Sequence, residues 1–151
     1  MLPDDVFRTK FDRTVEALRG WGGALGDCAR VEEESAARYW RIAVRPLAAG
    51  ACPLELILHH RQRCDFAIGD ESYEDRAVDE FDLLLPLAEA ITAGRVLTRQ
   101  KTSADTGAAL AIETHVRLAG GQVWQADRRL RSRSVPGRTI LEDRWFLPYR
   151  R

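Results

Sequence analysis

Apolar residues recur along the chain at two spacings, and the wider spacing predicts two helices. Four of them near the N-terminus are three or four residues apart and so share one helix face: Phe7, Phe11, Val15 and Leu18. Pro3 suits the first turn of this helix, and the glycines at positions 20, 22 and 23 are expected to end it. A second helix is predicted over residues 79–94, either kinked at Pro86 or starting near it, because proline fits poorly inside a helix.

Elsewhere apolar and polar residues alternate in short runs, which is the pattern of β-strands. Before the second helix these runs are residues 28–35, 37–44, 54–59 and 64–68, with a short run around Tyr73. After the second helix they are residues 95–102, 107–118, 121–132 and 138–147. Glycine-containing segments separate most of the runs, as expected for tight turns.

The order of these elements is a helix, a set of strands, a second helix and a second set of strands. Strands of a parallel sheet would alternate with helices, so antiparallel pairing is expected instead. The sequence therefore predicts a single α+β domain over residues 1–151, mainly antiparallel sheet with two helices packed on one face. The same order also fits a duplicated unit of one helix and three or four strands, although the two halves share no convincing repeat.

Residues 56–75 contain two of the three histidines and one of the three cysteines, followed by a cluster of acidic residues. If residues 61–63 form the turn of a hairpin, His60 lies opposite Cys64, and the apolar faces of both strands point into one core. The acidic residues between positions 70 and 75 are typical of a solvated surface turn. This stretch is therefore predicted to be a structural hairpin.

The alternative for this hairpin is a metal or thiol site. His60 and Cys64 offer two ligands, but a zinc site requires three or four. His59 points to the opposite face of its strand, and His115 is expected on the polar face of another. Because Cys64 is in phase with apolar neighbours, we expect a buried, inert thiol and no metal or cofactor. His60, Cys64 and His115 remain the candidate ligands, should sheet curvature bring them together.

Composition indicates a folded protein with no strong attraction to a polyanion. The chain has 45% hydrophobic and 30% charged residues, and its formal net charge is zero. Three widely spaced cysteines argue against a disulfide framework. The N-terminus lacks the apolar core of a signal peptide, and no apolar run approaches the ~20 residues of a membrane span. We therefore expect a soluble, cytoplasmic protein without a membrane partner.

Charge is unevenly distributed along the chain. Residues 70–93 hold eight acids and one Arg, whereas residues 117–151 hold nine Arg and three acids. We expect these segments to pair within the molecule or across a dimer, since charge runs are usually solvated or paired. The basic segment supplies the candidate partner-binding or nucleic-acid-binding residues, in which guanidinium groups and aromatic rings combine: Arg128, Arg129, Arg131, Arg133, Trp124 and Trp145.

The motifs of familiar enzymes are missing from the sequence, including the phosphate-binding glycine loop and the serine nucleophile elbow. The leading hypothesis is a small binding or adaptor protein without catalysis that forms a homodimer, in which residues 144–151 can also exchange between copies. Two alternatives stay open. One is a nucleic-acid-binding module that uses the Arg-rich strand, and the other is a metal- or thiol-dependent enzyme centred on His60 and Cys64.

Native mass spectrometry distinguishes these hypotheses when the protein is purified without a metal-affinity tag. We expect a homodimer of bare chain mass, because the sequence offers an incomplete set of metal ligands. A mass excess of one zinc per chain would contradict the structural hairpin. A heavier, dissociable adduct would instead indicate a small ligand held by the tryptophans.

Overall fold

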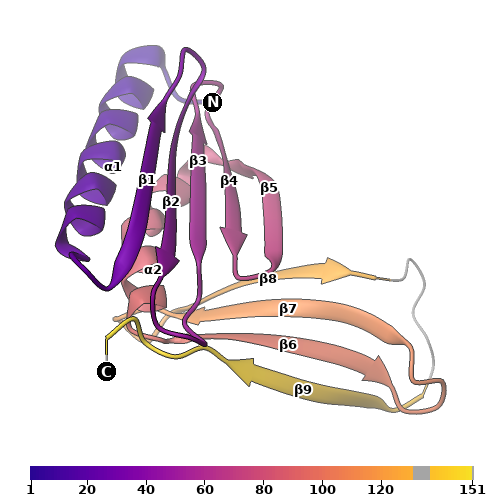
Figure 1. The fold of residues 1–151 in the computed structure, drawn as a ribbon. Helices are drawn as coiled ribbons and strands as arrows, with labels where there is room; N and C mark the ends of the chain where they lie inside the picture. The colour runs from indigo at the N-terminus through magenta and orange to yellow at the C-terminus, as the bar shows by residue number, and fades with distance from the viewer. Residues whose placement is uncertain (131–136, 151) are drawn as a thin grey trace.

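The computed structural model describes residues 1–130 and 137–150. The chain forms two parts, which we call the body and the arm (Figure 1). The body contains helix α1 (Asp4–Ala24), a five-stranded sheet, a short 3-10 helix (Val78–Glu80) and helix α2 (Phe81–Thr92). The arm is a four-stranded sheet that leaves one end of the body and extends sideways, so that the molecule has the shape of an L. The predicted α+β class is confirmed.

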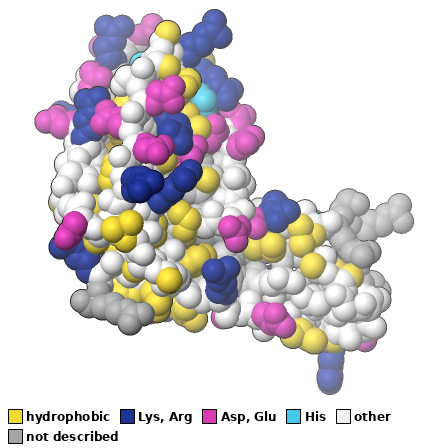
Figure 2. All heavy atoms as spheres, viewed as in Figure 1, with side chains coloured by type: hydrophobic (Ala, Val, Ile, Leu, Met, Phe, Trp, Pro, Cys, Tyr) yellow, Lys and Arg dark blue, Asp and Glu magenta, His cyan; other side chains and the backbone are white. Residues whose placement is uncertain are grey.

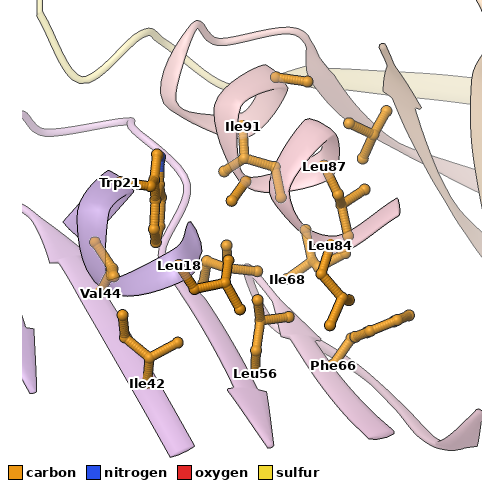
Figure 3. Packing of buried hydrophobic residues seen from close by; sticks show 14 of the residues in the cluster. Leu18, Trp21, Ile42, Val44, Leu56, Phe66, Ile68, Leu84, Leu87 and Ile91 are labelled. Carbon is orange, nitrogen blue, oxygen red and sulfur yellow. The ribbon is translucent and has the colours of Figure 1, made fainter. Parts of the chain in front are cut away.

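The sheet of the body is an antiparallel meander in the order β1-β2-β3-β4-β5. Its strands are Ala29–Ser35, Tyr39–Pro46, Leu54–His59, Arg63–Ile68 and Glu71–Ala77. Both helices lie on one face of this sheet, as predicted (Figure 1). Between helices and sheet lies a core of buried apolar side chains, shown in Figure 3, that includes Leu18 of α1, Leu84 and Leu87 of α2, and Ile42, Leu56 and Phe66 of the sheet.

The glycines near residue 20 do not end α1, which contradicts the prediction. The helix continues to Ala24, and its added turn buries Trp21, whose indole N–H donates to Thr92 Oγ1 at 3.0 Å. Gly22 faces the sheet, where a Cβ would lie only 3.3 Å from Ile42 Cδ1. Glycine is needed here for close packing rather than for termination, so tertiary contacts override its low helix propensity. Helix α2 runs from Phe81 to Thr92 with Pro86 inside it, so of the two alternatives the start near Pro86 is wrong.

The β3–β4 hairpin has a different register from the predicted one. Leu58, and not His60, lies opposite Cys64, and residues 60–62 form the turn. The shift is two residues, so side chains keep their faces and the apolar sides of both strands still meet in the core. Gln62 adopts a positive φ of 65° in this turn, and its amide group bonds to the backbone N–H and C=O of Leu2, each at 2.8 Å. Strand periodicity does not predict this long-range contact.

The arm has the strand order β8-β7-β6-β9. Its strands are β6 (Val96–Ser103), β7 (Ala109–Arg117), β8 (Val123–Arg129) and β9 (Thr139–Trp145). All neighbouring strands are antiparallel. Because the last strand pairs with the first, this order differs from the meander of the body, and the strand orders give no support to a duplicated unit.

The C-terminal segment returns to the body and packs against it. Leu147 forms a bridge with Ala51, and the Tyr149 hydroxyl donates to the Cys52 carbonyl oxygen at 2.6 Å. The C-terminal segment, which was expected to be able to exchange between two copies, thus packs on the body of its own chain. None of the described helices meets the length and hydropathy needed to cross a membrane.

Gly94, which links α2 to the arm, is expected to be sensitive to substitution. Its φ is +77°, and an added Cβ would lie 2.6 Å from the backbone nitrogen of Pro148. Gly94→Ala should therefore lower the free energy of unfolding by at least ~1–2 kcal/mol, measured by urea denaturation. Gly20→Ala is the matched control, since Gly20 is helical and has open space around it. That substitution should raise stability by about 0.5–1 kcal/mol, and an equal loss in both variants would contradict the close approach.

Candidate interaction surface

Aromatic packing fixes the arm to the body. Trp124 of β8 is buried edge-on against Phe66 and Tyr73, with ring centroids 5.5 and 5.9 Å away. The Tyr73 hydroxyl lies 2.6 Å from the hydroxyl of Thr114, which is fully buried in β7. These contacts involve only the end of the arm nearest the body, which we call its inner half.

An ion pair lies beside these aromatic contacts. We call the aromatic contacts of Trp124 and this ion pair, Glu71–Arg128, the joint between the arm and the body. Glu71 is only 4% exposed and accepts two hydrogen bonds from the Arg128 guanidinium, at 2.8 and 3.1 Å. Asp70, in the same turn, lies 4.0 Å from Arg144 of β9. The description of residues 70–75 as a solvated turn is therefore wrong for Glu71. The acidic and basic segments meet inside one chain, which was one of the two arrangements expected.

The two faces of the arm differ in chemistry. The body-side face carries buried Val96, Val116 and Trp124 near the joint. Further out on the same face the apolar side chains become more exposed: Ile112 is half-buried, and Ile140 is 49% exposed. Leu130, which directly follows β8, is 38% exposed. An antiparallel sheet normally buries its apolar face, so the outer half of the arm presents surface that is typical of an interface.

The opposite face, which we call the open face, is a network of charges. Arg99 binds Asp143 through two hydrogen bonds, at 2.7 and 2.9 Å. Glu113 lies 3.3 Å from Lys101 Nζ, His115 Nε2 and Gln125 Nε2. Burial acts to raise the pKa of Glu113, but the hydrogen bonds from His115 and Lys101 outweigh it and hold this pKa below its ordinary value. The paired charges stabilise the carboxylate and leave the face polar.

Strand β9 forms one edge of the arm and is exposed along its whole length. Its large apolar side chains are about half exposed: 49% for Ile140, 51% for Leu141 and 58% for Trp145. Alternation along the strand places Ile140 on the body-side face and the other two on the open face. Figure 2 shows apolar side chains on the surface of the arm where it extends beyond the body. Exposed edge strands of this kind readily pair with another strand.

The candidate metal ligands are not brought together. His60 lies in the β3–β4 turn and stacks on Phe11, with centroids 4.5 Å apart. Cys64 is fully buried in β4, and its thiol points toward the carbonyls of Arg76 and Ala77. His115 belongs to the arm, on its open face beside Glu113. The described residues contain no group of three or more histidines, cysteines or acids that could hold a metal ion.

The candidate partner-binding residues are divided between the two faces of the arm. Trp124 lies in the joint on the body-side face, whereas Trp145 pairs in register with Leu97 on the open face. Arg128 is bound to Glu71, and Arg129 follows it on the opposite face. Arg131 and Arg133 lie outside the described residues. The described members of this set therefore do not form one basic and aromatic surface.

Sequence reasoning did not single out the β9 edge. The available signal was the adjacent apolar pair Ile140 and Leu141, which places an apolar side chain on each face of one strand. Comparisons of the chain with protein-family models, curated proteins and solved structures find no match. The proposals below therefore depend on the geometry of this chain alone.

Thiol reactivity tests whether Cys64 belongs to a catalytic site. Burial raises the pKa of both Cys52 and Cys64 to about 12, so both thiols are protonated at pH 8. In the native protein we expect only Cys28, which is partly exposed, to react with a disulfide reagent within minutes. All three should react in denaturant. Mass spectrometry identifies the modified cysteines. Rapid modification of Cys64 in the folded protein would contradict the prediction that its thiol is buried and inert.

Proposed function

We propose that this protein is a non-catalytic binding protein that acts as a homodimer, and that the arm is the surface through which two copies associate. The observation that carries the proposal is the uncovered outer half of the arm, where Leu130, Ile140 and Leu141 are exposed on a sheet that projects from the body. Burying apolar surface against a second chain provides about 25 cal/mol per Å² of favourable free energy. A second arm supplies such a surface.

Charge supports a second copy of this chain as the partner. The edge strand and its approach carry both signs, with Arg138 and Arg144 on either side of Glu142 and Asp143. An antiparallel copy presents the same residues in reverse order, so Glu142 of one copy can lie near Arg138 of the other. A uniformly basic or acidic partner would meet repulsion at one of these positions.

The contacts of the aromatic and basic residues favour protein contact over nucleic acid. Single-stranded nucleic acid is bound by aromatic platforms beside a basic groove. Here the buried Trp124 supports the joint, and Arg128 is held by Glu71. The exposed apolar side chains at the outer half of the body-side face are aliphatic instead: Leu130 and Ile140.

Sedimentation velocity tests the association of arms. The wild-type chain should sediment as a dimer at micromolar concentrations, and Leu141→Lys should raise the dissociation constant about tenfold or more, since tenfold corresponds to ~1.4 kcal/mol. Val6→Lys is the control, because Val6 is an exposed apolar residue (48%) of helix α1 in the body. A wild-type protein that stays monomeric at 100-fold higher concentration would overturn the proposal, as would equal effects of both substitutions.

A further inference from the structure

The free edge of β9 can be assigned residue by residue. Phe146 N–H donates to the Val96 carbonyl at 3.1 Å, and the Arg138 carbonyl accepts from Ala104 N–H at 2.9 Å, so both of these β9 groups point toward β6. Backbone direction alternates along an antiparallel strand. Even-numbered residues of β9 therefore bond to β6, and the odd-numbered ones point their N–H and C=O groups outward: Thr139, Leu141, Asp143 and Trp145.

Contacts with the body prevent another strand from pairing with the chain directly after β9. Leu147 donates its N–H to the Gly50 carbonyl at 2.9 Å and forms a bridge with Ala51. A strand added beside β9 can thus pair with residues up to Trp145 but not with Leu147. The available edge is the seven-residue strand and the approach from Arg138.

The edge strand of the body sheet, unlike β9, is protected against pairing with another strand. Strand β1 is the outermost strand of the body sheet and carries three consecutive exposed glutamates at positions 32, 33 and 34. Runs of like charge discourage a second strand from pairing. Strand β9 instead combines exposed apolar side chains with charges of both signs, which suits pairing with a copy of itself.

We propose that two copies join by antiparallel pairing of their β9 strands about a two-fold axis at Leu141. This inference rests on the function proposed above, and specifies how the arms associate. Outward-facing groups must meet one another, so the odd-numbered residues of one strand lie opposite the odd-numbered residues of the other. Three neighbouring registers satisfy this condition, with their axes at Leu141, Glu142 or Asp143.

Contacts and charges separate these registers. An axis at Asp143 places Thr139 of the second copy opposite Leu147, whose outward N–H is already bonded to Gly50. An axis at Glu142 places two glutamates directly opposite each other, which is destabilising. The Leu141 axis leaves the Leu147 N–H bonded to Gly50 and separates the two glutamates, and its one direct like-charge contact is Arg144 opposite Arg138 of the second copy.

The pairs formed about Leu141 include apolar, polar and oppositely charged contacts, and one unfavourable pair of arginines. The two Leu141 side chains meet on the open face, and Thr139 lies opposite Asp143, whose charge is already bound by Arg99. On the body-side face, Glu142 lies diagonally across from Arg138 of the second copy, within reach of an ion pair. Arg144 lies opposite Arg138 of the second copy, and Asp70 offsets part of its charge.

This pairing gives one continuous sheet made of both four-stranded arms. Directly paired residues share a face, so the two bodies stand on the same side of the sheet. Ile140 lies on this side of the sheet, diagonally across from Ile140 of the second copy, so exposed apolar side chains of the two arms can pack together between the bodies.

Disulfide trapping tests the register in the full chain, with Cys28→Ser removing the partly exposed thiol. Leu141→Cys should give a covalent dimer under mild oxidation, because directly paired residues in a hydrogen-bonded pair have Cα atoms about 5.5 Å apart, within the range of a disulfide. Glu142→Cys is the matched control on the same strand. It lies opposite Ile140 of the second copy, so it should not form a disulfide with itself.

Each outcome decides a different claim. Cross-linking at position 141 alone supports the proposed register, and cross-linking at position 142 alone overturns it in favour of the Glu142 axis. A dimer by sedimentation that gives no covalent product at either position would overturn the Leu141 register but leave association of arms intact. A protein that remains monomeric would overturn both. Circular dichroism of each variant confirms that the chain is folded before oxidation.

Discussion

The attachment of the arm to the body is the constraint on which the rest of the molecule depends. An isolated sheet of four strands has little to bury, and here only its inner half gains a core, through Trp124 against Phe66 and Tyr73. The Glu71–Arg128 ion pair then closes the joint at a site where the carboxylate is almost fully buried. Breaking such a pair leaves a buried charge without a partner, which is strongly unfavourable. The joint thus holds the arm at a defined angle to the body.

A fixed arm has a consequence for its outer half. Because the arm projects beyond the joint, its apolar residues there remain exposed on a preformed sheet surface. Rigid, preformed surfaces lose less conformational entropy on association than mobile ones do. The charge network built on Arg99–Asp143 and Glu113 keeps most of the open face polar, so the exposed apolar side chains of that face, Leu141 and Trp145, lie at the β9 edge.

Much of the fold could be predicted because alternation and helical spacing are local. Within the described residues, nine strands and two helices lie near their predicted positions, and the alternation in β7 correctly placed His115 with Glu113. The errors arose where distant contacts decide the outcome. Trp21 needs the packing of α1 beyond its glycines, and Gln62 fixes a turn by bonding to Leu2. Burial of Glu71 depends on Arg128, 57 residues away, so no local pattern could reveal it.

The uneven charge along the sequence was the main reason to expect a dimer. The structure weakens that reason. Glu71 and Arg128 belong to the two oppositely charged segments, and they meet within one chain. Charge segregation is therefore explained in part by the joint, whether or not a second copy binds. The remaining evidence for self-association is strand β9, a short segment in which Glu142 and the flanking arginines lie among exposed apolar residues. Specificity for a second copy then resides in the order of charges along a single edge strand, and not in the opposite charge of two large segments.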